Sequence, residues 1–160
     1  MGVATNLWKV GMRVSLTRIV FTVILALVLW IFASLLARAD VRILASPGGQ
    51  VGDFLDLFEE VRNSGDRVVI DGPCLSACTL VLSIVPSERI CVTRRAVLGF
   101  HAARSVDRLG RIYAEPEASR LVLEAYPYPV RNWIVQRGGL TSHLLLLRGR
   151  ELAAMYRRCR

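Results

Sequence analysis

The sequence is short of two side chains that commonly act as bases in catalysis. It contains one lysine, Lys9, and two histidines, of which His101 is one. Lys9 lies near the N-terminus, so composition excludes a Ser–Lys catalytic pair in the remainder of the chain.

Charge of either sign is absent from residues 19–36, and no acidic residue precedes this apolar run. Small residues follow it at Ala37 and Ala39. The basic residues before it are Lys9, Arg13 and Arg18. This pattern is typical of a secretory signal, which we expect to be cleaved after Ala39. An uncleaved membrane anchor is the alternative, because about 20 apolar residues span a bilayer as a helix.

Both interpretations give the same domain organisation. Residues 1–39 form a signal peptide or membrane anchor, and residues 40–160 form one exported domain, because the basic flank stays in the cytoplasm. We therefore expect the domain in the periplasm, or on the inner membrane facing the periplasm. An uncleaved chain would contact the membrane through residues 19–36.

A strong excess of one charge is also lacking in the predicted domain. The formal net charge of the chain is +8, and half of it comes from residues 1–39. The rest is spread along the sequence, which indicates a solvated surface of mixed charge and argues against a nucleic-acid partner.

The four cysteines, at positions 74, 78, 91 and 159, all lie in the exported part. In an oxidising compartment an even number of cysteines predicts disulfides, and we expect at least one, with three pairings open. A zinc site using Cys74, Cys78, Cys91 and His101 is the alternative, but this spacing fits no strong zinc pattern. We therefore expect neither a metal nor another cofactor.

Apolar periodicity predicts an α/β domain in which strands alternate with helices and pair mainly in parallel. The predicted strands are residues 41–44, 67–71, 90–93 and 97–100. The predicted helices are residues 51–64, 75–85, 115–125, 130–136 and 151–158. The remaining stretches are predicted to be a turn at 72–73, a loop at 103–114 and an extended segment at 126–129.

Three features with chemical potential occur in order along the chain. The Gly48–Gly49 pair lies between a strand and a helix, where backbone N–H groups can approach an anion closely. Ser76 follows a strand and a Gly–Pro turn at the start of a buried helix, which suits a nucleophile, although a serine there is also a common helix cap. His101 closes a strand, a position at which histidine is more often structural than catalytic.

Taken together, these features resemble the Clp protease proteolytic subunit of the ClpP/crotonase superfamily. The resemblance runs over residues 41–103 and is greatest to exported relatives with an S-A-C-T serine motif. The matching positions are Ser46 to Gly49, Ser76, Arg89 and His101. It implies a minimal spiral of strand–helix repeats, with Ser76 as nucleophile and His101 as general base. The N–H groups of Gly49 and Ala77 would form the oxyanion hole.

The sequence departs from that family in two respects. Little chain precedes the S-P-G-G strand, so the sheet should be truncated. The third, acidic member of the triad has no clear counterpart. Glu151 lies in the right general region. The other candidates are Asp107, Glu115, Glu117 and Glu124.

Two functions follow from the resemblance. The first is a peptidase-like serine hydrolase of the bacterial envelope acting on a peptide or ester. The second is a catalytically inactive binding or assembly module that retains the fold. The family forms rings, so we expect a homo-oligomer. An ATP-dependent unfoldase partner is not expected, because the compartment has no ATP supply.

Overall fold

The computed structural model describes residues 18–31 and 40–159. The chain divides into two compact units, Met1–Arg38 and Ala39–Arg160. In the first unit residues 18–31 are helical, and the remainder of the apolar run 19–36 lies outside the described residues. Within the described ranges, no helix is both long enough and apolar enough to cross a membrane. The choice between signal and anchor stays a prediction.

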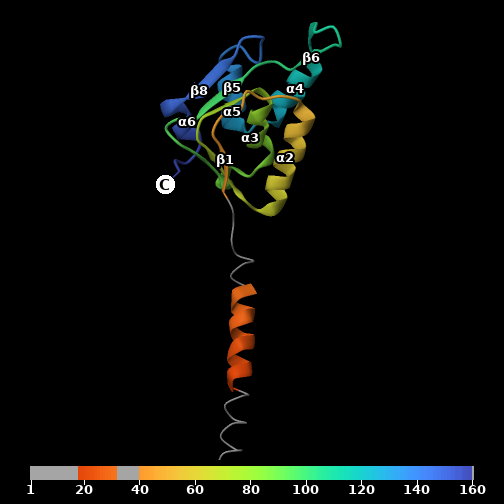
Figure 1. The fold of residues 1–160 in the computed structure, drawn as a ribbon. Helices are drawn as coiled ribbons and strands as arrows, with labels where there is room; N and C mark the ends of the chain where they lie inside the picture. The colour runs from red at the N-terminus through yellow and green to blue at the C-terminus, as the bar shows by residue number, and fades with distance from the viewer. Residues whose placement is uncertain (1–17, 32–39, 160) are drawn as a thin grey trace, which may run out of the picture. The chain divides into compact units, whose positions relative to one another are not determined.

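Figure 1 shows the elements of the second unit. Its first sheet is entirely parallel. It contains β1 (Asp40–Ile43), β2 (Arg67–Ile70) and β4 (Ile90–Val92), in the spatial order β1-β2-β4. The central strand β2 buries Val68, Val69 and Ile70, as expected where helices and sheet cover both faces of a parallel strand. These three strands confirm the predicted parallel α/β layer.

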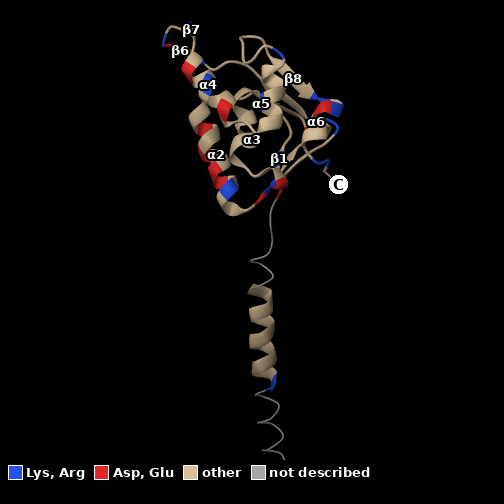
Figure 2. Ribbon diagram, turned by 180° about the vertical axis from the view of Figure 1, so that it is seen from behind, with Lys and Arg blue, Asp and Glu red and all other residues tan. Residues whose placement is uncertain are grey.

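Helix α2 (Val51–Ser64) connects β1 to β2 and buries Phe58 and Val61. Figure 2 shows the acidic residues along its outer side, as amphipathic periodicity predicts. The helix ends at Gly65, whose φ of 80° is the left-handed conformation that terminates many helices. The Arg89 guanidinium, which precedes β4, donates hydrogen bonds to the carbonyl oxygens of Arg62 at 2.9 Å and Asp66 at 3.3 Å, near this helix end.

The second sheet contains one antiparallel strand that the sequence did not predict. It consists of β3 (Pro73–Leu75), β5 (Val97–Phe100) and β8 (Leu145–Arg148); β3 and β5 are parallel, and β8 runs antiparallel to β5. The predicted turn at 72–73 instead leads from the first sheet into the second. A Cβ atom on Gly72 would lie 1.8 Å from the carbonyl oxygen of Leu44, so only glycine permits this passage.

The predicted helix over residues 75–85 is wrong in its first half. Residues Ser76–Leu80 form a 3₁₀ turn, η1, and the α-helix α3 covers only Val81–Ile84. The prediction of burial is correct, since Ala77 through Leu82 are all buried. Ser76, with a φ of 55°, lies outside the right-handed region and cannot be part of a regular α-helix.

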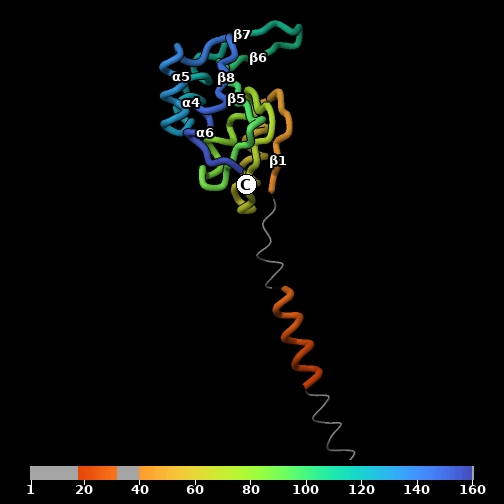
Figure 3. Tube along the Cα trace, turned by 90° about the vertical axis from the view of Figure 1, so that its left-hand side faces the viewer, coloured from red at the N-terminus to blue at the C-terminus, as the bar shows by residue number. Residues whose placement is uncertain are grey.

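The predicted loop 103–114 is a two-stranded hairpin of β6 (Arg104–Val106) and β7 (Ile112–Ala114), which extends away from the rest of its unit (Figure 3). Helix α4 (Pro116–Ala125) follows as predicted. Helix α5 (Tyr128–Val135) begins inside the segment predicted to be extended, because Pro129 occupies its first turn, where proline needs no backbone donor.

The C-terminal segment closes the free edge of β4. After α6 (Gly149–Met155), the N–H of Val92 donates to the carbonyl of Arg157 at 3.0 Å, and the N–H of Cys159 donates to that of Val92 at 3.1 Å. The Cys91–Cys159 disulfide fixes this pairing covalently. A short 3₁₀ turn, η2 (Ser87–Arg89), precedes β4.

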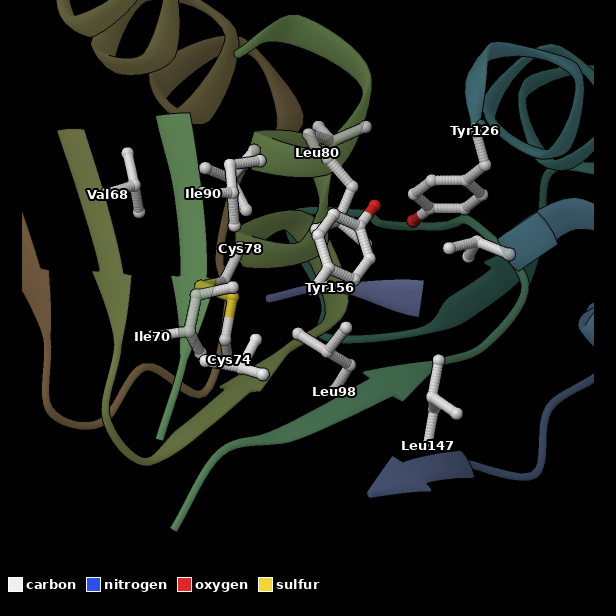
Figure 4. Packing of buried hydrophobic residues seen from close by; sticks show 14 of the residues in the cluster. Val68, Ile70, Cys74, Cys78, Leu80, Ile90, Leu98, Tyr126, Leu147 and Tyr156 are labelled. Carbon is white, nitrogen blue, oxygen red and sulfur yellow. A yellow bond between two sulfur atoms is a disulfide. The ribbon is translucent and has the colours of Figure 1, made fainter. Parts of the chain in front are cut away.

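The core lies between the two sheets and the helices (Figure 4). Apolar side chains from both sheets meet there with a second disulfide, Cys74–Cys78. All four cysteines are therefore paired, which confirms the predicted disulfides and leaves no thiolate for a zinc ion.

One buried carboxylate, at the end of β2, binds side chains from β1 and from the segment that follows β4. Asp71 is 4% exposed and accepts hydrogen bonds from Arg42 at 2.7 Å, from Thr93 at 2.7 Å and from Arg95 at 2.5 Å. The hydrogen bonds from Arg95 and Thr93, more than that from Arg42, hold the pKa of the Asp71 carboxyl well below its ordinary value, against the opposing effect of burial.

Candidate active site

Ser76 occupies the sharp turn between β3 and η1. Its φ of 55° is the only positive value at a non-glycine residue in the described part of the chain. A side chain in this region costs about 1–3 kcal/mol, and such residues persist where the surroundings over-determine them, often at functional sites. The conformation is therefore not that of an ordinary helix cap, in which the serine has an extended backbone.

The S-P-G-G loop lies directly against this turn. The N–H of Ser46 donates to the carbonyl of Pro73 at 2.8 Å, and the N–H of Leu75 donates to that of Ser46 at 2.9 Å. At Gly48, whose φ is 86°, an added Cβ would lie 2.6 Å from the Ser76 Cβ and 3.0 Å from the Ala77 nitrogen. Glycine is required here both for its conformation and for this close approach.

The two predicted oxyanion donors border cavities that Ser76 also lines. Gly49 lines the larger cavity and Ala77 the smaller. The neighbouring Gly48 N–H is already engaged, since it donates to the Ser46 hydroxyl at 3.3 Å. Within the described residues, the Gly49 N–H donates to no protein acceptor, so it remains available to a ligand.

His101 directly follows β5 and is half-buried. Its Nδ1 lies 2.6 Å from the carbonyl oxygen of Ala102. A carbonyl oxygen only accepts hydrogen bonds, so this contact assigns the proton of the neutral ring to Nδ1. The other ring nitrogen, Nε2, then carries the lone pair that a general base needs.

Ser76 and His101 line the same two cavities. In the described part of the chain no hydrogen bond joins the Ser76 hydroxyl to the imidazole. Such contacts between nucleophile and base are often long in the free enzyme and shorten when substrate binds. The fold thus brings together the two residues that sequence reasoning selected, from strands β3 and β5 that are adjacent in one sheet.

The candidate third acids all have other partners. Glu151 accepts a hydrogen bond from Arg137 at 2.5 Å. Each of the remaining candidates, Asp107, Glu115, Glu117 and Glu124, contacts residues of its own hairpin or helix. Among the described residues no carboxylate forms a hydrogen bond with His101, and its Nδ1 contacts the Ala102 carbonyl. The role of Glu151 as the third member stays a prediction.

The two cavities differ in size and character. The smaller has a volume of about 40 Å³ and is bordered mostly by apolar groups, among them Val51, Leu80 and Val122. The larger, about 820 Å³, is an open groove between the S-P-G-G loop and residues 103–106. A groove of this size is within the range that accommodates organic ligands, and the small cavity beside it has room for a short apolar side chain.

A chain of hydrogen bonds stabilises the turn at Ser76, which we call the serine turn. The Thr79 hydroxyl donates to the Ser76 carbonyl at 2.6 Å and lies 2.6 Å from the Tyr126 hydroxyl. Because Thr79 has one hydroxyl proton, Tyr126 must be the donor in the second bond. Burial raises the pKa of Tyr126 to about 12, so this phenol keeps its proton. Sequence reasoning missed both residues, although Thr79 ends the S-A-C-T motif.

The comparisons with known proteins agree with this architecture. The chain is similar to a solved structure of a ClpP1 mutant from Listeria monocytogenes, with a TM-score of 0.50 and 17% sequence identity; the match covers 74% of this chain and 69% of that one. No protein-family model matches the sequence, and no curated protein matches it. A likeness at this identity establishes the fold alone, so the chain has a ClpP-like α/β fold.

Proposed function

We propose that this chain is a serine hydrolase in which Ser76 is the nucleophile and His101 the general base. The observation that carries the proposal is the left-handed conformation of Ser76 at a strand-to-helix turn, in cavities shared with His101. Backbone strain at a single polar residue beside a ligand-sized groove is stronger evidence for a functional role than the presence of a serine and a histidine alone.

The reaction is an acyl transfer in two stages. His101 Nε2 accepts the proton of Ser76 Oγ as Oγ attacks the substrate carbonyl carbon. The oxyanion that forms accepts hydrogen bonds from the N–H groups of Gly49 and Ala77. The imidazolium then returns its proton to the leaving amine or alcohol as the acyl–enzyme forms. In the second stage His101 deprotonates a water molecule, which attacks the ester and releases the acid and free Ser76.

The substrate class we propose is a peptide or ester with a small apolar group on the acyl side. The cavity of about 40 Å³ beside Ser76 supports this choice, because Leu80, Val122 and Tyr126 leave room for little more than a methyl or isopropyl group. The larger groove would hold the rest of the substrate.

We propose that the protein lies in the bacterial envelope and that it forms a homo-oligomer. Two disulfides support an oxidising compartment. The β6–β7 hairpin supports self-association, since Val106, Leu109 and Ile112 expose apolar side chains on it. Sedimentation of the full chain as a monomer would remove the oligomer from this proposal.

A non-catalytic binding module is the second candidate. It is favoured by the hydrogen bond from His101 to a neutral carbonyl where related triads have a carboxylate. The two candidates differ in whether Ser76 is activated. We expect a fluorophosphonate probe to label the full-length chain, made under oxidising conditions, and not its Ser76→Ala variant. Folded wild-type protein that resists the probe would favour the binding module.

A further inference from the structure

We propose that the Cys74–Cys78 disulfide is a positioning element for Ser76, holding the serine turn in the conformation from which it reacts. The disulfide has a sequence separation of 4, and Ser76 is the central residue of the loop that it closes. This inference rests on the proposed role of Ser76 as the nucleophile.

The serine turn needs an external constraint. A φ of 55° is unfavourable for serine, and η1 that follows is a five-residue 3₁₀ turn, which is too short to be stable by itself. An unconstrained chain would relax to an extended or right-handed conformation at residue 76. Such a change would move Oγ and the Ala77 N–H together, since both depend on the same backbone angles.

The disulfide supplies that constraint from a rigid base. Cys74 lies in β3 and pairs with Leu98 of β5. The backbone of Cys74 also forms a β-bridge with Ser46 of the S-P-G-G loop. Cys78 lies in η1, on the other side of the serine. The bond fixes their Cα atoms 5.3 Å apart and so limits the conformations open to the three residues between them. With Thr79 bound to the Ser76 carbonyl, the turn is held on both sides of its strained residue.

Burial makes this disulfide a permanent constraint and not a redox switch. Cys74 is 0% and Cys78 1% exposed, so a reductant reaches the sulfur atoms only when the core opens. We therefore expect dithiothreitol to leave the activity of the folded protein unchanged under conditions that do not unfold it.

The second disulfide provides a matched control. Cys91–Cys159 has a sequence separation of 68 and ties the C-terminal tail to β4, and neither cysteine lines a cavity with Ser76. Loop-closure entropy predicts that its removal costs more thermal stability than removal of the short loop. We therefore expect removal of Cys91–Cys159 to lower mainly the thermal stability, and removal of Cys74–Cys78 to lower mainly the reactivity of Ser76.

The test compares Cys74→Ala/Cys78→Ala with Cys91→Ala/Cys159→Ala in the full chain, at a temperature where circular dichroism shows both to be folded. The concentration dependence of fluorophosphonate labelling separates probe affinity from the rate of bond formation. We expect the first variant to lose about 10²-fold in that rate with its affinity unchanged, and the control to lose less than about twofold. Equal rates in the two folded variants would overturn the inference.

Hydrogen exchange measured by mass spectrometry adds a readout that does not depend on activity. We expect amides 76–80 to exchange faster in Cys74→Ala/Cys78→Ala and to be unchanged in the control. Unchanged exchange in both variants would refute the positioning role. Wild-type protein that is never labelled would refute the hydrolase proposal. In that case, faster exchange confined to amides 76–80 of Cys74→Ala/Cys78→Ala would still establish that the disulfide holds the turn.

Discussion

The Nδ1 atom of His101 lies 2.6 Å from the carbonyl oxygen of Ala102, the next residue in the chain. This contact selects the tautomer that a general base requires, as a carboxylate does in a complete triad. A neutral carbonyl stabilises the imidazolium less than a carboxylate would. Under the proposed function, we therefore expect slow hydrolysis that still depends on His101.

Replacement of that histidine tests the base directly. We expect His101→Ala to lower the rate of fluorophosphonate labelling by about 10²–10⁴-fold, the usual contribution of a general base. His143→Ala is the control, because His143 is exposed and lines neither cavity. Labelling that is equally fast in both variants would show that Ser76 needs no imidazole.

The fit of Gly48 against the serine turn gives a second prediction. In Gly48→Ala the new methyl group would overlap the Leu75 carbonyl oxygen and the Ser76 Cβ, each 2.6 Å away. We expect a loss of about 1–3 kcal/mol in unfolding free energy beyond that of a suitable control, and loss of labelling. The control is Gly138→Ala, because Gly138 has a similar φ of 92° and open space around it. Equal denaturation midpoints for the two variants would contradict this packing.

A third prediction concerns the backbone of Ser76. It distinguishes the effect of backbone strain on stability from the loss of the nucleophile. Ser76→Gly and Ser76→Ala both remove the nucleophile, so neither should be labelled. Glycine tolerates the φ of 55°, whereas alanine does not. We expect Ser76→Gly to be more stable than Ser76→Ala by about 0.5–1 kcal/mol in chemical denaturation, after allowance for the greater freedom of glycine in the unfolded chain. The reverse order would place residue 76 in an ordinary conformation.

Local sequence patterns were sufficient to predict much of the first half of the domain. The periodicity that ends at Gly65 predicted α2, and the apolar run after it predicted β2. Ser76 follows a predicted strand and a Gly–Pro turn, and His101 directly follows a predicted strand; their order along the chain, with the S-P-G-G segment, carried the resemblance that selected them. Parallel pairing of β3 and β5 then brings the two residues to the same end of the sheet.

Some of the features that were missed depend on contacts between distant parts of the chain, and one depends on a local turn. Strand β8 pairs with β5 and buries Leu147; the apolar run 144–147 is a local signal for a strand, but its antiparallel partner lies more than 40 residues earlier in the chain. The hairpin at 104–114 depends on Asp107, whose carboxylate accepts hydrogen bonds from the backbone of Leu109 and Arg111. The bond between Thr79 and Tyr126 joins residues 47 positions apart, so sequence alone could not pair them.

The buried carboxylate of Asp71 makes the fold sensitive to acid. Its pKa is lowered in the folded protein, chiefly by hydrogen bonds from Arg95 and Thr93 and also by that from Arg42. A lowered pKa means that the contribution to stability is complete above the ordinary value of 3.8 and is lost as the pH falls below it. We expect the unfolding temperature of the wild-type protein to fall as the pH is lowered from about 5 to about 2.

Asp71→Asn should reveal how much of that fall belongs to this one residue. The amide side chain at position 71 carries no charge at any pH. We therefore expect this variant to be less stable than wild type at pH 7 and to lose less stability on acidification. The two melting temperatures should therefore converge below about pH 4. Asp53→Asn, at an exposed position in the first turn of α2, should keep the wild-type pH dependence. A constant difference between wild type and Asp71→Asn from pH 7 to pH 2 would mean that Asp71 does not titrate with folding and that its arginine contacts contribute nothing to acid sensitivity.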